Sequence, residues 1–599
     1  MSSEAEAGAS VWLLGTRPED TASGLPAPHS ARGVVAVELD GAGEPSARRE
    51  FDASELPGFV RARAGRPTRF AFSDTPLWYP PLLAAGVTIE RSRDLRLAHA
   101  ILAGAQALAG APEGRALAAA QEWAAPPLTE VEDLRGEALF DVEEFGSERR
   151  RARTKQVPHD IDSALAEYRR QERAIAASAQ PARLRLLLAA ESAGGLVAAE
   201  MQAAGVPWDV AEHDRILAEH LGPRPMEGAK PAKMLEVAQE VRAALGDPRA
   251  NLDSPPRLLQ ALRNAGINVA STSKWELREH DHSAVEPLLR YKKQARLLTA
   301  NGWNWLDEWV RDGRYRPVYV PGGVVTGRWA ASGGGALQIP RQLRPALRAD
   351  PGWTLISADV AQLEPRALTA MSGDRAMAEA GRGRDLYSGL VEEGIVGTRQ
   401  EAKIAVLGAM YGSTTGESGR LVPRLRTSFP AAMALVDSAA EVGRRGGRVS
   451  TWLGRTSPEP DERWREAQAR GNRFDASPQD ENRARRAAGD WGRFTRNFVV
   501  QGTAAEWALA WLADLRLRLA QLPATGGEPA RASGPVFERR AHLVFFLHDE
   551  VIVHAPLEQA EVAAQAIREA AASAGRVMFG QAPVDFPLDL TVAERAAKG

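Results

Sequence analysis

The clearest pattern of apolar and polar positions lies in two stretches that are far apart in the chain. Residues 354–358 form an apolar run that predicts a β-strand ending at Asp359. Residues 543–547 and 551–553 are two further apolar runs, separated by His548, Asp549 and Glu550. Apolar arms around a polar turn predict a β-hairpin with its acids at the tip. If the hairpin and the first strand are neighbours in one sheet, Asp359 and Asp549 face each other.

The rest of the pattern predicts several units, and the length gives a prior of roughly four domain-sized pieces. Short apolar runs near the N-terminus predict a small α/β unit, with strands at residues 11–15, 33–39 and 68–72 and helix over 81–121. Residues 126–160 contain a Pro-Pro pair, many acids and then an arginine run, so we interpret them as a linker. Downstream, the pattern predicts helices over 160–220, 284–310, 398–412, 493–501, 505–521 and 558–578, and a further helix that begins after Asp253 or Ser254. It also predicts strands at 315–320 and 584–592 and a loop over 522–537.

Two predicted helices each carry a stripe of candidate binding residues at a spacing of four. Arg399, Lys403, Leu407 and Tyr411 share one stripe, because a step of four drifts only about 40° around a helix. Two cations followed by an aliphatic and an aromatic side chain suit the phosphates and base of a nucleotide. The same spacing places Arg493, Asn497 and Gln501 on one polar stripe, and hydrogen-bonding side chains of this kind suit the acceptors of a DNA minor groove. For the first stripe, the alternative is an amphipathic helix with two surface cations.

Composition excludes several classes of function. The chain has 599 residues, is 44% hydrophobic and contains no cysteine, which excludes disulfides and thiolate chemistry. Residues 1–10 lack the features of a signal peptide, and no apolar run reaches about 18 residues, so we expect a soluble cytoplasmic protein without membrane contact. The net charge is −2, but residues 1–150 carry −8 and residues 396–500 carry +6. This asymmetry indicates a basic face on the second segment, unless its arginines are merely solvated.

The facing acids predict a cation site. Two carboxylates at close range repel unless a cation lies between them, and Mg²⁺ prefers oxygen ligands. Two such ions roughly 3.5–4 Å apart can stabilise both oxygens of a phosphoryl transfer. Neither Asp359 with Glu364 nor His548-Asp549-Glu550 is specific in isolation, so the order and spacing of all the motifs carry the argument.

In that order, the motifs resemble those of the family A DNA polymerases, the bacterial DNA polymerase I type. Thr326-Gly-Arg328 with Leu337-Gln-Ile-Pro340 resembles the first polymerase motif, and Asp359 to Arg366 resembles motif A. The stripe from Arg399 to Tyr411 resembles motif B, the stripe from Arg493 to Gln501 resembles the helix that reads the primer-template, and His548-Asp549-Glu550 resembles motif C. The resemblance covers roughly residues 185–599.

The resemblance implies an α/β, multidomain right-hand fold with palm, fingers and thumb behind an exonuclease-like domain. It implies an exonuclease-like domain over 1–125, linker and connecting helices over 126–184, thumb and connecting helices over 185–325, palm over 326–395 and 500–599, and fingers over 396–499. The family's separate 5′ nuclease domain has no room in this chain. The implied function is template-directed addition of deoxynucleotides to a primer 3′ end, in DNA repair or replication, by a monomer acting in the cytoplasm on the nucleoid.

The resemblance also assigns roles to residues. It implies catalysis by Asp359, Asp549, Lys403 and Glu550, with two Mg²⁺ ions, replaceable by Mn²⁺, on Asp359, the carbonyl of Val360 and Asp549. The incoming deoxynucleoside triphosphate would contact Arg399, Lys403, Leu407, Tyr411, Gln362 and the sugar-selecting Glu364. Primer-template DNA would contact Arg328, Gln338, Arg493, Asn497, Gln501 and His548. Four positions depart from the family pattern: Ala361 for Ser, Tyr387 for His, Leu407 for Phe or Tyr, and Ile339 where an Asn is usual.

The N-terminal unit lacks most acids of the family's 3′→5′ proofreading site. Residues 11–15 contain no acid, Glu38 and Asp40 stand on the next strand in reversed order, and Asp94 matches a non-catalytic position. Only Tyr168-x3-Glu172 keeps the family's form. We therefore expect a degenerate exonuclease domain and no proofreading. The alternatives are a bifunctional 3′→5′ exonuclease and polymerase, and a non-catalytic DNA-binding protein on a polymerase scaffold.

Overall fold

A four-stranded antiparallel sheet lies at the centre of the molecule. The computed structural model describes residues 10–17, 33–41, 43–124, 157–226, 228–332, 339–412 and 416–596. The strand order is β12-β13-β11-β14. These strands are β11 Trp353–Val360, β12 His542–Leu547, β13 Glu550–Pro556 and β14 Leu588–Ala593. The predicted hairpin and its pairing with the Asp359 strand are confirmed, because β13 lies beside β11 with Asp359 opposite Glu550. The turn is shorter than expected, since Glu550 already belongs to β13 and only His548 and Asp549 connect the strands.

The N-terminal unit has a five-stranded sheet in the order β3-β2-β1-β4-β5. Its strands are β1 Ser10–Thr16, β2 Val34–Leu39, β3 Pro45–Phe51, β4 Thr68–Phe72 and β5 Ser92–Asp94. The predicted strands correspond to β1, β2 and β4. The prediction missed β3, an exposed and polar edge strand with no apolar alternation. Uniform helix over 81–121 was wrong, since β5 interrupts the helices around it. The helices of this unit are α2 Leu56–Arg61, α3 Thr75–Trp78, α4 Pro80–Ala84, α5 Leu95–Leu102 and α6 Pro112–Ala119.

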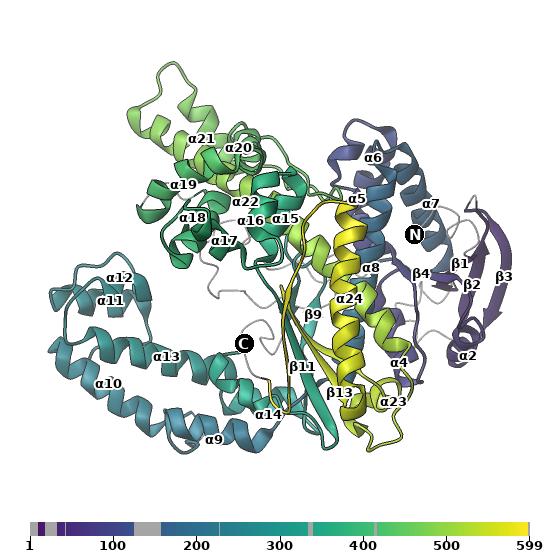
Figure 1. Ribbon diagram of the computed structural model, residues 1–599, viewed down its shortest axis with the longest axis horizontal. Coiled ribbons are helices and arrows are strands. Elements are labelled where there is room, and N and C mark those ends of the chain that lie inside the picture. Colours follow the sequence, from purple (N-terminus) through teal and green to yellow (C-terminus); the bar gives the residue numbers. More distant parts are fainter. Residues whose placement is uncertain are drawn as a thin grey trace.

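Helix α8, Pro181–Ala204, joins this unit to the central sheet (Figure 1). It follows α7, Ile161–Ala177, and is buried along most of its length. At the interface, Arg516 donates to both carboxylate oxygens of Glu200 at 3.1 and 3.0 Å and to the carbonyl of Glu90 at 2.8 Å. Tyr79 also donates to Glu200, at 2.6 Å. The two units therefore share one apolar core and one buried ion pair.

A curved helical arm, residues 210–309, extends from one end of the central sheet (Figure 1). It consists of α9 Val210–Leu221, α10 Ala232–Leu245, α11 Pro255–Asn264, α12 Lys274–Arg278, α13 Val285–Asn301 and α14 Trp303–Trp309. Ser254 is the N-cap of α11, one of the two candidates from sequence. The single helix predicted over 284–310 was wrong, because the chain leaves helical geometry at Gly302 (ψ −168°). There a Cβ would lie 2.2 Å from the carbonyl oxygen of Leu298, so glycine permits the close turn between the two helices.

Short strands connect the arm to the rest of the molecule. They are β6 Val206–Pro207, β7 Val310–Arg311, β8 Arg314–Tyr315, β9 Val318–Val320 and β10 Ala330–Ser332. The strand predicted over 315–320 is split between β8 and β9, and Pro317, which cannot donate to a ladder, lies between them.

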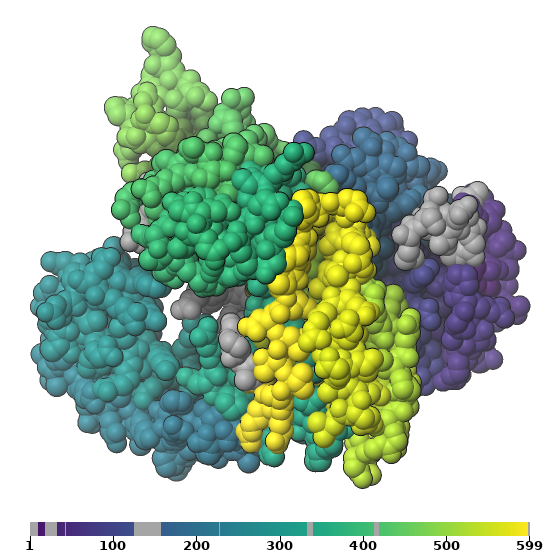
Figure 2. Space-filling view, viewed as in Figure 1, coloured from purple at the N-terminus to yellow at the C-terminus, as the bar shows by residue number. Residues whose placement is uncertain are grey.

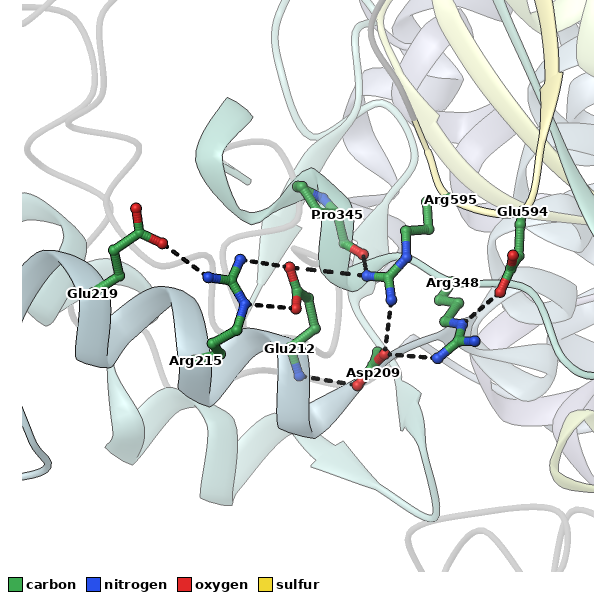
Figure 3. Close-up of polar contacts among 8 residues, drawn as sticks. All are labelled: Asp209, Glu212, Arg215, Glu219, Pro345, Arg348, Glu594 and Arg595. Carbon is green, nitrogen blue, oxygen red and sulfur yellow. Dashed lines mark hydrogen bonds and ion pairs between the residues drawn. The ribbon is translucent and has the colours of Figure 1, made fainter.

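Ion pairs hold the base of the arm to the sheet (Figure 3). Asp209, the N-cap of α9, lies 3.3 Å from Arg348 and 3.5 Å from Arg595. Arg595 also donates to the carbonyl of Pro345 at 2.8 Å, and Arg348 pairs with Glu594 at 2.7 Å. The residues after β14 and the segment before β11 thus meet at the residue that caps the first helix of the arm.

A helical block, residues 363–471 with the first half of α22, lies across from the arm. Its helices are α15 Leu363–Ser372, α16 Arg375–Gly381, α17 Leu386–Glu392, α18 Arg399–Tyr411, α19 Gly416–Ser428, α20 Pro430–Arg444 and α21 Glu462–Gly471. Helix α22, Pro478–Ala520, is one continuous helix where sequence predicted two. Gly502 lies inside this helix and does not end it. Its missing side chain makes room for Thr451 and the carbonyl of Thr326, which pack against the helix there. Figure 2 shows an opening between block and arm.

The chain closes over the central sheet with two more helices, α23 Gly534–Phe537 and α24 Ala560–Phe579. Helix α23 lies within the segment predicted as loop. Helices α22 and α24 pack on each other, and α24 packs on β11 and β13.

Candidate active site

A cavity of about 440 Å³ lies where β11 and the β12–β13 turn meet the helical block. Its walls combine residues from β11, α15, α17, α18, α22, the hairpin turn and β14. From the sequence-predicted set, the cavity contains Arg328, Asp359, Val360, Gln362, Glu364, Arg399, Lys403, Leu407, Tyr411, His548 and Asp549. It therefore brings together residues from the first polymerase-like motif and from motifs A, B and C.

Asp359 and Asp549 form the acidic side of the cavity. Asp359 is next to the last residue of β11, and the amide of Val360 donates to the carbonyl of Asp549 at 2.9 Å. His548 adopts φ +55°, a left-handed conformation that turns the chain back within two residues. Burial, together with the negative charge of Asp359, raises the pKa of Asp549 to about 7. Two carboxylates brought together at a partly buried position form a donor set that fits a divalent cation.

Glu550 binds an arginine outside that pair of aspartates. Both of its carboxylate oxygens accept from Arg344, at 2.5 and 2.6 Å, and both side chains are buried. Hydrogen bonding to Glu550 raises the pKa of Arg344, so the guanidinium stays charged. Sequence reasoning missed Arg344, which carries no motif signal of its own in the segment before β11.

Glu364 lies in the first turn of α15, lines the cavity and bridges two other predicted residues. It forms an ion pair with Arg328 and accepts from the Tyr411 hydroxyl at 2.5 Å. Burial and the charge of Glu364 raise the pKa of Tyr411, so the phenol remains the donor. Gly327 holds Arg328 in place with φ +87°, and a Cβ there would lie 2.5 Å from Nε of Arg455.

Helix α18 presents the predicted stripe to the cavity. It starts with a capping box between Thr398 and Glu401 and ends at Gly412, whose φ is +73°. Arg399, Lys403, Leu407 and Tyr411 all line the cavity, as their spacing predicts. Among the described residues Lys403 makes no ion pair, and its side chain is exposed.

Arg399 has a carboxylate partner that sequence reasoning missed. Its Nε and Nη2 donate to the two oxygens of Asp385 at 3.1 and 2.8 Å. Burial acts against ionisation of Asp385, but hydrogen bonds from Arg399 and Ser388 lower its pKa, so it is a carboxylate. Tyr387, which stands where the family pattern has His, lines the same wall of the cavity. The Arg399 guanidinium lies 5.6 Å from the centroid of its ring.

Asp589 is a second missed acid. It lies on β14 directly opposite Asp359 on β11, so the two side chains project from the same face of the sheet. It also lines the cavity, although it is more exposed than Asp549. The sequence predicted the strand but offered no signal for its partner.

The stripe on α22 lies outside the cavity lining. Arg493 is exposed and pairs with Asp490, and Gln501 hydrogen-bonds to Tyr411. Within the described chain, the side-chain oxygen of Asn497 is buried without a hydrogen-bond partner. Gln338, predicted to contact DNA, lies outside the described residues.

The acids of the N-terminal unit are dispersed. Asp94 is fully buried and accepts from the amides of Thr75 and Leu97, which makes it the cap of α5. Glu172 pairs with Arg93 and Arg185. Throughout the parts of the chain that the structure describes, no three side chains of His, Asp or Glu converge as a metal-binding group.

No helix in the described segments is both long and apolar enough to cross a membrane.

Comparisons with known proteins agree with this geometry. The model of DNA polymerase family A matches residues 226–595. The chain is 27% identical over 439 residues to a thermostable DNA polymerase I of Thermus aquaticus, covering 66% of this chain and 46% of that protein. It is 28% identical over 356 residues to DNA polymerase I of Chloroflexus aurantiacus, covering 55% and 34%. The matched region thus spans less than half the length of these relatives.

A solved structure shares the fold over nearly the whole chain. The POL domain of Pol1 from M. smegmatis, in complex with DNA primer-template and dNTP, aligns with a TM-score of 0.65 and 18% identity. The alignment covers 99% of this chain and 96% of that domain. Since the family model matches more than half of the residues of this chain, the chain belongs to DNA polymerase family A.

Proposed function

We propose that the chain is a template-directed DNA polymerase that adds deoxynucleotides to a primer 3′ end. The observation that carries the proposal is the meeting of Asp359 and Asp549 with the cationic stripe of α18 in one cavity. Relatives named DNA polymerase I support it, as does a structural neighbour whose title names primer-template and dNTP. The reaction is attack of the primer 3′-hydroxyl on the α-phosphate, with release of pyrophosphate.

The acidic side of the cavity would hold the metal ions. Asp359, Asp549 and the carbonyl of Val360 supply only oxygen donors, which suits Mg²⁺, and Mn²⁺ can take its place. When bound, two divalent ions stabilise negative charge on the attacking and leaving oxygens. Glu550 supports this side indirectly, because its ion pair with Arg344 fixes the first residue of β13 opposite Asp359.

The other side of the cavity would bind the nucleotide. Arg399 and Lys403 place positive charge where the triphosphate arrives, and Lys403 holds a proton that can neutralise the leaving group. Leu407 and Tyr411 offer an apolar surface to the base. Glu364 fills the floor beneath the sugar, held by Arg328 and Tyr411, and there a 2′-hydroxyl would collide with it.

The opening between arm and helical block is the proposed path of the DNA, with the arm as thumb and the block as fingers (Figure 2). Arg493, Asn497 and Gln501 on α22, with Arg328 and His548, would contact the primer-template. The proposed role is in DNA repair or replication. We also propose that the N-terminal unit does not proofread, because Asp94 caps α5 and Glu172 is held in ion pairs with Arg93 and Arg185.

Primer extension with Asp549→Asn tests the proposal. The variant should lose extension in Mg²⁺ and in Mn²⁺ while still binding primer-template, because it removes a ligand charge without removing the DNA-facing surface. Asp475→Asn, an exposed substitution at a residue that does not line the cavity, is the matched control and should extend normally. Near-normal synthesis by Asp549→Asn would refute the mechanism, and no synthesis by the parent protein would refute the function.

A further inference from the structure

Asp385 does not line the cavity, but it binds two residues that do, Gln362 and Arg399. It is the N-cap of α17, and its Oδ1 accepts from the amide of Ser388 at 2.7 Å. The same carboxylate accepts two hydrogen bonds from Arg399 on α18 and one from Nε2 of Gln362 at 2.7 Å. Gln362 belongs to the turn that follows Asp359 and adopts φ +51°. One acid therefore connects the cationic helix to the strand that carries the catalytic aspartate.

The contact with Arg399 has the geometry of phosphate recognition. A guanidinium presents parallel N–H groups that match two oxygens of a carboxylate or a phosphate equally well. The carboxylate of Asp385 accepts from such an edge of Arg399, formed by Nε and Nη2. The Arg399 side chain is 58% exposed at the cavity wall, and Tyr387 lies against it. Arg399 can therefore move between acceptors while it stays within the wall.

We propose that Asp385 stands in for the triphosphate in the nucleotide-free protein and yields Arg399 when the triphosphate binds. This inference rests on the proposed function and adds a specificity element to it. Each ligand that draws on Arg399 must displace the carboxylate, so part of its binding free energy is spent on that exchange. A ligand that does not reach Arg399 is unaffected. Asp385 thus acts as a positioning residue that sets the affinity for the phosphate tail and not for the base or sugar.

The test uses Asp385→Asn, which removes the negative charge and keeps the cap, since Asn caps helices as well as Asp. Binding is measured on the full chain with a dideoxy-terminated primer-template, so that no chemistry occurs. The probes are the matching deoxynucleoside triphosphate, inorganic tripolyphosphate and the matching deoxynucleoside monophosphate. Loss of one exposed ion pair should tighten the first two by about threefold to fivefold. The monophosphate should bind as it does to the parent protein.

Asp437→Asn is the matched control. Asp437 accepts the same two-bond fork from Arg426, with both distances 3.1 Å, on helices that do not line the cavity. It also pairs with Arg496 at 2.7 Å, so its stability is measured beside its binding. Steady-state extension by Asp385→Asn should show a lower KM for the triphosphate with kcat within twofold of the parent. Asp385→Ser also removes the charge and can cap α17, so it should reproduce the shift, which excludes a local effect of the Asn side chain.

The outcomes separate the two claims. Unchanged or weaker triphosphate and tripolyphosphate binding by both variants would overturn the exchange role of Asp385. Equal tightening of the monophosphate, or the same shift in Asp437→Asn, would also overturn it, because the effect would then be a general change of charge. If the parent protein extends no primer, the proposed function fails, whatever the binding of tripolyphosphate shows.

Discussion

The ion pair between Arg344 and Glu550 should be one of the most sensitive points of the central sheet. The two side chains are 9% and 6% exposed, and the bonds between them measure 2.5 and 2.6 Å. Removing one partner of a buried pair leaves the other charge uncompensated, which typically costs about 3–5 kcal/mol. Arg344→Gln should lie in this range, because the unpaired Glu550 is also the cross-strand neighbour of Asp359.

The double variant Arg344→Gln with Glu550→Gln should recover most of that loss. Neutral side chains that keep hydrogen-bonding groups remove the uncompensated charge, so the double variant should lie within about 1 kcal/mol of the parent. The coupling is measured by urea unfolding of the parent, both single variants and the double variant. Circular dichroism and tryptophan fluorescence should be followed together, because the chain has more than one unit.

An exposed ion pair provides the control for this cycle. Arg348 and Glu594 are 46% and 62% exposed at the base of the arm (Figure 3), so Glu594→Gln should change stability by less than about 1 kcal/mol. If Arg344→Gln loses no more than this control, or if the two single effects simply add in the double variant, the buried pair does not stabilise the sheet as argued.

Three further predictions concern the floor of the cavity, a buried acid and the N-terminal unit. Glu364→Ala should raise the ratio of ribonucleotide to deoxynucleotide incorporation, measured by competitive single-nucleotide extension; an unmoved ratio would remove Glu364 from sugar selection. Burial raises the pKa of Glu506 from its usual value to about 7, so the folded state holds this proton more tightly and stability falls as pH rises from about 5 to above 7. Glu506→Gln should therefore stabilise the protein at pH 8, by up to about 3 kcal/mol, and hardly at pH 5, and an equal gain at both values would contradict the assignment. Incubation with a 3′-mismatched primer and Mg²⁺ but no nucleotides should leave the primer intact, whereas shortening that survives Asp549→Asn and is lost in Glu38→Ala or Glu172→Ala would show a working exonuclease.

The sequence predicted those features whose cause is local. The β12–β13 hairpin follows from two apolar runs around a polar turn, and its neighbour β11 from one buried run. The stripe on α18 follows from helical geometry alone, and all four of its residues line the cavity. These elements were predictable because the pattern that specifies them lies within a few residues of the chain.

The failures have causes that lie elsewhere in the fold. Strand β3 is polar and exposed, so only its pairing with β2 marks it as a strand. Glycine has opposite effects at two positions: a helix ends at Gly302, whereas α22 continues through Gly502. At Gly302 the neighbour is the preceding turn of its own helix, whereas at Gly502 it is Thr451, from a distant segment. No local rule separates these two glycines, because the second depends on tertiary packing.

The same limit applies to the charges around the cavity. From sequence, Arg328, Arg399 and Lys403 are three cations available to phosphate. In the structure Arg328 is paired with Glu364 and Arg399 with Asp385, and within the described residues only Lys403 of the three makes no ion pair. The acids that neutralise the two arginines come from α15 and from the start of α17. A motif can therefore name the cations that recognise a triphosphate, but their affinity depends on carboxylates that the fold brings to them. If Arg399 exchanges the two oxygens of Asp385 for those of a phosphate, as we propose, selectivity at such a site follows from the difference between two similar interactions, and not from the number of positive charges.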